Sequence, residues 1–88
     1  MPVEIFFKRS AQCEFGRLPR DIQRRFAEAF ELLAEEPTRR RSGLDVRPLR
    51  GVKGAWRLRV GDYRGIYEAA PGKVSFTRFG HRSSIYDV

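Results

Sequence analysis

Cysteine and histidine are almost absent from this sequence of 88 residues, which contains one of each, Cys13 and His81. A single cysteine excludes an internal disulfide, and one cysteine with one histidine cannot supply the ligands of a structural zinc site. The acidic residues are scattered, so no carboxylate cluster predicts a metal either. We therefore expect no metal and no other cofactor, in a protein suited to a reducing compartment.

Long apolar runs are absent as well. No stretch approaches the roughly 20 apolar residues of a membrane-spanning helix, and the first ten residues, MPVEIFFKRS, show no secretory signal. We expect a cytoplasmic protein without a membrane partner. The hydrophobic share of 41%, with seven phenylalanines, is enough for a core, and the length predicts one domain, residues 1–88.

Acidic residues are scarce in one central segment, residues 38–67, where only Asp45 and Asp62 occur. The same segment holds nine basic residues: Arg39, Arg40, Arg41, Arg47, Arg50, Lys53, Arg57, Arg59 and Arg64. It therefore accounts for the whole net charge of +7. A basic field confined to one segment indicates a polyanion or an acidic protein as partner, with a merely solvated surface as the plainer alternative.

The first half of the chain is predicted to form a strand and two helices. Residues 3–7 alternate as a half-buried strand does. A short helix capped by Ser10 follows, and then a longer one that begins at Pro19 and ends before Pro37. The inner faces of the two helices are apolar: Ala11, Phe15 and Leu18, then Ile22, Phe26, Ala29, Phe30 and Leu33.

The second half is predicted to be irregular at residues 38–54 and then to form a meander. Three strands are expected, at residues 55–60, 63–69 and 73–79. Gly61–Asp62 suits a type II′ turn between the first two strands, and Pro71–Gly72 a type II turn before the last. The fold class is therefore α+β in the order β-α-α-β-β-β, with a helical hairpin covering one face of an antiparallel three-strand meander.

The turn at residues 61–62 predicts the register of the first hairpin. It sets Val60, Leu58 and Trp56 opposite Tyr63, Gly65 and Tyr67 on an apolar side, and Arg57 opposite Ile66 on the other. It also sets Arg59 opposite Arg64 on the open side, where like charges cost stability unless an anion such as phosphate lies between them. An ideal second turn would place Phe79 opposite Arg64 and His81 on the same side. A bulge would shift this by one residue and reverse the faces.

Two segments of the second half resemble the RelE/ParE superfamily, the toxins of type II toxin–antitoxin systems. They are LRGVKGAWRLRVGDYRGIYEA, residues 49–69, and FGHRSSIY, residues 79–86. The element order agrees over essentially the whole chain, whereas the specific motifs cover only its second half. The short helical hairpin and the Gly-His-Arg…Tyr tail resemble the RelE branch more than the ParE branch. The resemblance implies a single RelE-like toxin domain.

A RelE-like toxin enters the ribosomal A site and cuts messenger RNA there, so the resemblance implies an endoribonuclease whose partners are mRNA, the 70S ribosome and a cognate antitoxin. Two strand positions that carry lysine in the best-known members are matched by Arg57 and Arg59. The other matched positions are Arg64, Arg82 and Tyr86.

Two departures from the family pattern affect the expected mechanism. Arg59 stays protonated and cannot act as a base, and the spacing from Arg82 to Tyr86 is short. We therefore expect His81 or Tyr86 to take or relay the 2′-OH proton. The remaining roles follow the charges: Arg59 and Arg64 hold the scissile phosphate, Arg57 holds the neighbouring backbone and Arg82 stabilises the leaving oxygen. Further RNA contacts are expected from Arg39, Arg40, Arg41, Arg50 and Lys53.

Two other functions stay open. A ParE-like inhibitor of DNA gyrase would have no nuclease chemistry and would cause DNA damage instead of mRNA cleavage. A non-catalytic RNA-binding domain, or a degenerate toxin, would bind RNA with strong salt dependence and leave it intact.

Overall fold

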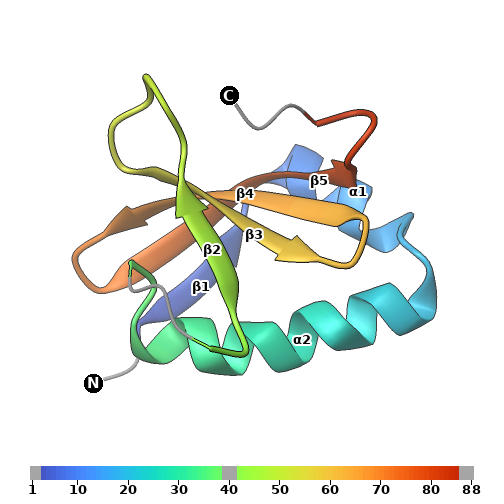
Figure 1. Cartoon of the computed structure of the whole chain (residues 1–88), viewed down its shortest axis with the longest axis horizontal. Coiled ribbons are helices and arrows are strands. Elements are labelled where there is room, and N and C mark those ends of the chain that lie inside the picture. Colours follow the sequence, from blue (N-terminus) through green and yellow to red (C-terminus); the bar gives the residue numbers. More distant parts are fainter. Residues whose placement is uncertain (1–2, 39–41, 86–88) are drawn as a thin grey trace.

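The computed structural model describes residues 3–38 and 42–85. Its elements are β1 (Glu4–Phe7), α1 (Arg9–Gly16), α2 (Arg20–Glu35), β2 (Asp45–Pro48), β3 (Ala55–Val60), β4 (Tyr63–Ala70) and β5 (Lys73–His81) (Figure 1). The strands form one sheet in the order β1-β5-β4-β3-β2, in which β1 runs parallel to β5 and the other neighbours are antiparallel. The predicted α+β class and its meander are confirmed.

Helix α2 begins within one residue of its predicted start, whereas α1 begins two residues earlier than predicted. Ser10 does not cap α1: the N-cap is Lys8, which makes no side-chain cap. The Lys8 N–H makes the last hydrogen bond between this segment and β5, to the Phe76 carbonyl at 2.9 Å. Helix α1 begins at the next residue, where the pairing with β5 has ended. Pro19 is the N-cap of α2, and its carbonyl accepts the Gln23 N–H at 2.9 Å.

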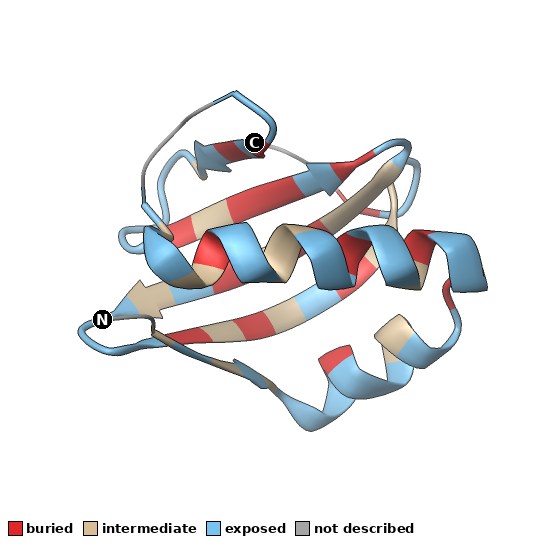
Figure 2. Cartoon of the chain, turned by 90° about the horizontal axis from the view of Figure 1, so that it is seen from below, coloured by how far each residue is buried: buried red, intermediate tan, exposed pale blue. Residues whose placement is uncertain are grey.

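The core lies between the two helices and one face of the sheet (Figure 2). The predicted stripes turn inward, with Ala11, Leu18, Ile22, Phe26 and Leu33 buried. Phenylalanines fill the centre: the Phe76 ring contacts four other aromatic rings, at centroid distances of 4.9 to 5.6 Å. Among the described residues no helix lies on the opposite face of the sheet, which is called the open face below.

The segment predicted to be irregular contains a strand, and this expectation was wrong. β2 pairs antiparallel with β3, with Asp45 opposite Arg59 and Arg47 opposite Arg57. Leu44 and Val46 are buried, whereas Asp45 and Arg47 are exposed. The alternation at residues 44–47 is the shortest that indicates a strand, and β2 takes its hydrogen bonds from the edge of β3.

The predicted register of the β3–β4 hairpin is confirmed at every position, including Arg59 opposite Arg64. Gly61 has φ of 59°, the positive value that the first central position of a type II′ turn requires. The turn therefore fixes which side chains share the open face.

The β5 register expected from an ideal turn was wrong, and the alternative with a bulge is confirmed, because a bulge separates Ile66 from Tyr67 in the β4–β5 pairing. Gly80, and not Phe79, lies opposite Arg64. The packing explains the bulge. Phe76 and Phe79, three residues apart, would point to opposite faces of a regular strand, yet both rings stack in the core at 4.9 Å.

Two contacts hold this bulge in place. The Phe79 N–H donates to the Glu14 carboxylate of α1 at 3.0 Å. Gly65 lies opposite Phe79, where a Cβ would come within 2.9 Å of carbons of both the Phe76 and the Phe79 ring. The bulge therefore depends on a carboxylate from α1 and on the absence of a side chain at Gly65 of β4.

Candidate functional site

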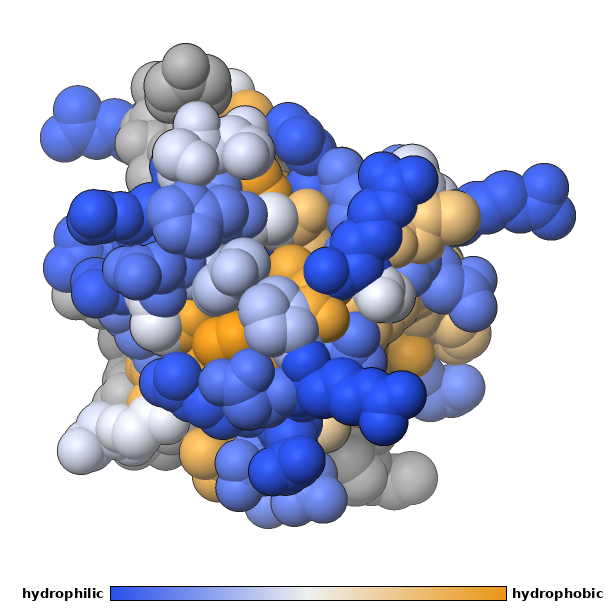
Figure 3. Space-filling view, turned by 90° about the vertical axis from the view of Figure 1, so that its right-hand side faces the viewer, coloured by the Kyte–Doolittle hydropathy of each residue, from blue (hydrophilic) through white to orange (hydrophobic). Residues whose placement is uncertain are grey.

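The sheet register places the four strand arginines of the central basic segment, Arg47, Arg57, Arg59 and Arg64, on the open face. One row crosses four strands as Asp45, Arg59, Arg64 and Gly80, and the next row crosses them as Arg47, Arg57, Ile66 and Arg78. The side of the molecule that carries the β3–β4 turn is densely covered with hydrophilic side chains around a smaller apolar area (Figure 3). The charge that was local in sequence is therefore also local in space.

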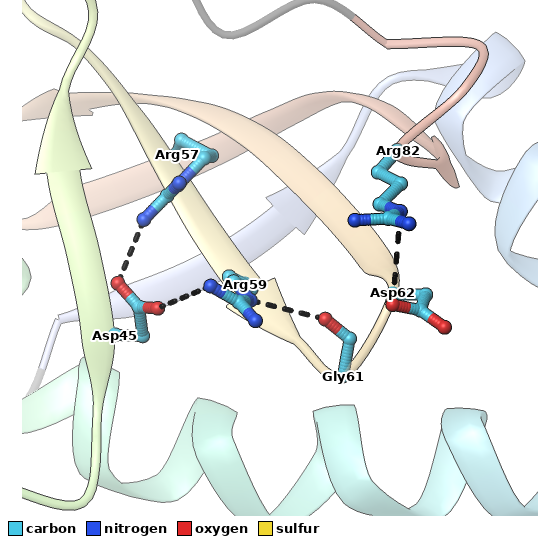
Figure 4. Close-up of polar contacts among 6 residues, drawn as sticks. All are labelled: Asp45, Arg57, Arg59, Gly61, Asp62 and Arg82. Atoms are coloured by element: carbon cyan, nitrogen blue, oxygen red, sulfur yellow. Dashed lines mark hydrogen bonds and ion pairs between the residues drawn. The ribbon is translucent and has the colours of Figure 1, made fainter.

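Arg57 and Arg59 share one carboxylate, that of Asp45 (Figure 4). Arg57 Nη2 lies 2.7 Å from Asp45 Oδ1, and its side chain is only 7% exposed. Arg59 Nη1 lies 3.8 Å from Asp45 Oδ2, and its side chain is 49% exposed. Arg59 also donates from Nε to the Gly61 carbonyl, at 3.1 Å. The first arginine is thus fixed inside the site and the second faces solvent.

Arg64 lies beside these two on β4. It is partly buried, and its Nε and Nη1 atoms are screened from solvent. The facing arginines Arg59 and Arg64 form a cationic pair of which one member is sheltered and the other accessible. A guanidinium in such surroundings interacts more strongly with an anion than one in bulk water.

Arg82 is attached to the same β3–β4 turn as Arg59. Its backbone N–H donates to the Asp62 carbonyl at 2.8 Å, and its Nε lies 3.8 Å from Asp62 Oδ1. Both of these side chains are 65% exposed. Gly61 therefore accepts from Arg59 while Asp62 holds Arg82, so a two-residue turn positions arginines from β3 and from the end of β5 (Figure 4).

His81 does not share the open face with Arg64, contrary to the expectation from an ideal turn. The bulge pairs His81 with Tyr63, and the two rings meet edge to face at 5.3 Å. Its Nδ1 accepts the Ser83 N–H at 3.1 Å and lies 2.9 Å from the Ser83 hydroxyl. Because a backbone N–H can only donate, the neutral ring carries its proton on Nε2.

We expect His81→Asn to retain most cleavage activity and His81→Ala to lose several-fold more, because the asparagine side chain still offers an acceptor for the Ser83 N–H. Single-turnover cleavage of the two variants, measured side by side with their melting temperatures, checks this. Equal and near-complete loss in both would instead identify His81 as a proton-transfer group, since asparagine cannot titrate.

The tail after β5 folds back onto the sheet. The Ser84 and Ile85 N–H groups donate to the His81 carbonyl, at 2.8 and 3.2 Å, and Ile85 is 3% exposed. Gly80 makes this possible, because a Cβ there would lie 3.1 Å from Ile85 Cδ1. Tyr86 and Arg39–Arg41, predicted as site residues, lie outside the described residues. Arg50 and Lys53 are exposed in the loop between β2 and β3.

Sequence reasoning missed the two acids that hold the site. Asp45 and Asp62 were noted only as the exceptions in a basic segment, and each is an ion-pair partner of a site arginine. They are the only two acidic residues in the basic segment 38–67, and this isolation was the sequence feature that could have identified them. Within residues 3–38 and 42–85 no group of three or more His, Cys, Asp and Glu side chains could hold a metal ion. No helix in that part of the chain is long and apolar enough to cross a membrane.

A groove of about 910 Å³ separates α2 from the β2–β3 edge of the sheet. Three arginines, Arg25, Arg47 and Arg59, line it with two acids, Glu28 and Asp45, and with Leu32, which is 42% exposed. The Arg25 guanidinium lies against Gly61, where a Cβ would be 3.3 Å from Nη1. The groove therefore combines positive charge with an exposed apolar side chain, and it reaches the site through Arg59.

Known proteins share both the sequence pattern and the fold. Toxin RelE3 of Methanocaldococcus jannaschii is 27% identical over 85 residues, which cover 97% of each chain. RelE in the solved RelE–RelB complex of Pyrococcus horikoshii matches with a TM-score of 0.79 and 27% identity, over 97% of this chain and 100% of that one. A chain of the RelBE2 toxin–antitoxin complex of Mycobacterium tuberculosis matches with a TM-score of 0.77 and 28% identity, over 93% and 100%.

A family model described as the ParE toxin of the type II toxin–antitoxin system parDE matches residues 5–86. This match spans both helices and all of the sheet except its first residue, Glu4, and it agrees with the RelE relatives at the level of the superfamily. The chain therefore belongs to the ParE toxin family, within the RelE/ParE superfamily of toxins of type II toxin–antitoxin modules.

Proposed function

We propose that this toxin is a ribosome-dependent, metal-independent endoribonuclease that cuts mRNA in the A site. The single observation that carries the proposal is the arginine pair Arg59–Arg64, held face to face on the open side of the sheet. Two guanidinium groups in register on one sheet face attract an anion, and their planar forks suit a phosphate group. Because its substrate is mRNA on the 70S ribosome, the toxin acts in the cytoplasm.

The reaction begins when the 2′-OH attacks the neighbouring phosphate. Arg59, half exposed, meets the phosphate first, and the partly buried Arg64 stabilises the charge that develops on the phosphorane. Arg82, held by Asp62 at the adjacent turn, stabilises the leaving 5′-oxygen. The reaction needs no redox step, and its two proton transfers require one acceptor and one donor.

The proton acceptor is His81 or Tyr86, because arginine cannot serve as a base. The Nδ1 atom of His81 is engaged by Ser83, in the neutral ring Nε2 carries the proton, and the bulge turns the ring away from Arg64, so His81 is poorly placed for either proton transfer. Tyr86, as its phenolate, is then the preferred group to take the 2′-OH proton and to return a proton to the leaving 5′-oxygen, and it can also stack on an unpaired base. Arg57, whose side chain is only 7% exposed, attracts the neighbouring RNA backbone by its positive charge from beneath the surface of the open face.

In its inactive state the toxin is bound by an antitoxin, and the antitoxin occupies the groove between α2 and the β2–β3 edge. Relatives with this fold were solved as toxin–antitoxin complexes. The arginine side chains and the exposed Leu32 suit a segment that carries acidic residues and one apolar face. Such a segment would reach Arg59 and so compete with RNA.

We expect Leu32→Asp to weaken antitoxin binding by about 10- to 100-fold, because it loses apolar contact and adds a charge that repels an acidic partner. Val52→Asp is the matched control, since Val52 is also exposed, at 52%, but does not line the groove. Calorimetric titration of the cognate antitoxin into each variant checks this. Equal affinities for the two variants would show that the antitoxin does not bind in the groove.

The function is tested by primer extension on a defined mRNA in a translation reaction, with and without stalled ribosomes. Cleavage within the A-site codon only when ribosomes are present would support the proposal. The family description names parDE, which keeps a gyrase inhibitor as the second candidate. Intact mRNA together with inhibition in a DNA supercoiling assay would favour that candidate, and salt-sensitive RNA binding without either effect would indicate a degenerate toxin.

A further inference from the structure

Asp45 is the acid of an otherwise cationic row on the open face, and it contacts two site arginines at different distances. We propose that Asp45 is a positioning residue: its carboxylate fixes Arg57 and aims Arg59 until an RNA phosphate takes the place of the carboxylate at Arg59. The inference rests on the proposed RNA substrate, since it assigns Asp45 a role at the same site.

The two ion pairs of Asp45 differ in strength. The contact of 2.7 Å to Arg57, with that side chain 7% exposed, has the length of a charge-assisted hydrogen bond in a sheltered place. The contact of 3.8 Å to Arg59, with that side chain 49% exposed, is long and open to water, where ion pairs contribute little. An incoming phosphate therefore displaces the second contact and leaves the first intact.

The fold holds the Asp45 carboxylate in a fixed place. Asp45 lies in register opposite Arg59, so the pair belongs to a strand ladder and not to a flexible loop. Its neighbours Leu44 and Val46 are buried and anchor β2 on the core side. A carboxylate held in this way can set the direction of an arginine, whereas a carboxylate on a free loop only lowers the local potential.

The charges of the site explain why such a residue is needed. Arg57 and Arg59 lie two residues apart on the same face of β3, and Arg64 lies opposite Arg59 on β4. Arg57 is almost fully buried. A buried guanidinium requires close compensation, which Asp45 supplies, and a compensated Arg57 repels Arg59 less. Removal of the Asp45 charge would make the face more attractive to RNA and at the same time less ordered.

The expected signature of Asp45→Asn is therefore tighter RNA binding with slower cleavage. We expect binding of a 2′-O-methyl RNA, which cannot be cleaved, to tighten about fivefold, and single-turnover cleavage to slow about tenfold or more. Glu31→Gln, which removes one negative charge from the exposed side of α2, is the matched control and should change neither quantity by more than about twofold.

A double-mutant cycle with Arg59→Ala tests whether Asp45 acts through Arg59. If it does, Asp45→Asn should change RNA binding about fivefold in the wild-type background and hardly at all in the Arg59→Ala background. Equal effects in both backgrounds would overturn the proposal, because they would show only a general charge effect. A parallel fall in binding, cleavage and melting temperature would also overturn it, because that pattern indicates a purely structural role.

The binding cycle does not depend on catalysis, so the two ideas can fail separately. If the wild type does not cleave mRNA but the coupling between Asp45 and Arg59 is present in RNA binding, the nuclease proposal fails and the positioning role stands. If the wild type cleaves and Asp45→Asn cleaves equally well, the positioning role fails alone. If the wild type does not bind RNA, both fail together.

Discussion

Arg59→Ala is expected to reduce A-site cleavage by about 10²- to 10³-fold, the usual cost of removing one group that stabilises transition-state charge. Arg59 is the accessible member of the facing pair, and its Nε donates to the Gly61 carbonyl, so its guanidinium is already oriented when RNA arrives. Single-turnover cleavage on stalled ribosomes measures the loss. The melting temperature should change little, because the side chain is 49% exposed and its ion pair is long.

Arg24→Ala is the matched control for this experiment. Arg24 is exposed on α2, so this substitution removes the same charge at a position that is not on the open face. Arg59→Lys separates charge from geometry: lysine keeps the positive charge but cannot form the planar fork. We expect it to retain part of the activity. Full cleavage by Arg59→Ala would exclude the arginine pair from the chemistry and would leave the open face as a docking surface only.

Phe76→Ala is expected to lower the free energy of unfolding by about 3–5 kcal/mol, as deletions of fully buried aromatic rings do. Phe76 is 0% exposed and lies at the centre of the phenylalanine cluster, stacked on Phe79 at 4.9 Å. Small domains of this kind are stable by only about 5–15 kcal/mol, so the variant should be close to unfolding at physiological temperature. Urea denaturation followed by circular dichroism measures the change.

Phe6→Ala is the control for Phe76→Ala, because the same ring is removed from a position that is 48% exposed, where its ring faces the Lys73 ammonium at 6.0 Å. Its cost should be below about 1 kcal/mol. Similar costs for the two variants would mean that the cluster around Phe76 does not carry the stability of the fold.

Local features of the sequence were sufficient for much of this protein. The apolar stripes of α1 and α2 predicted their buried faces, because a helix repeats every few residues along one segment of chain. The type II′ turn at Gly61–Asp62 predicted the whole β3–β4 register, because a two-residue turn and a period of two leave no freedom in the pairing. The facing arginines, and with them the main element of the candidate site, followed from that register.

Tertiary structure alone decided the second half of the site. Strand β2 forms because the edge of β3 offers it hydrogen bonds, and only that pairing brings Asp45 to Arg57 and Arg59. The bulge in β5 forms because Phe76 and Phe79 must both enter a core built by distant helices, and it turns His81 away from Arg64. Sequence by itself determined the features that depend on a few neighbouring residues, namely the buried faces of the helices and the register of the β3–β4 hairpin. The placement of the carboxylate and of the imidazole required contacts between segments far apart in the chain, whose energies no local pattern contains.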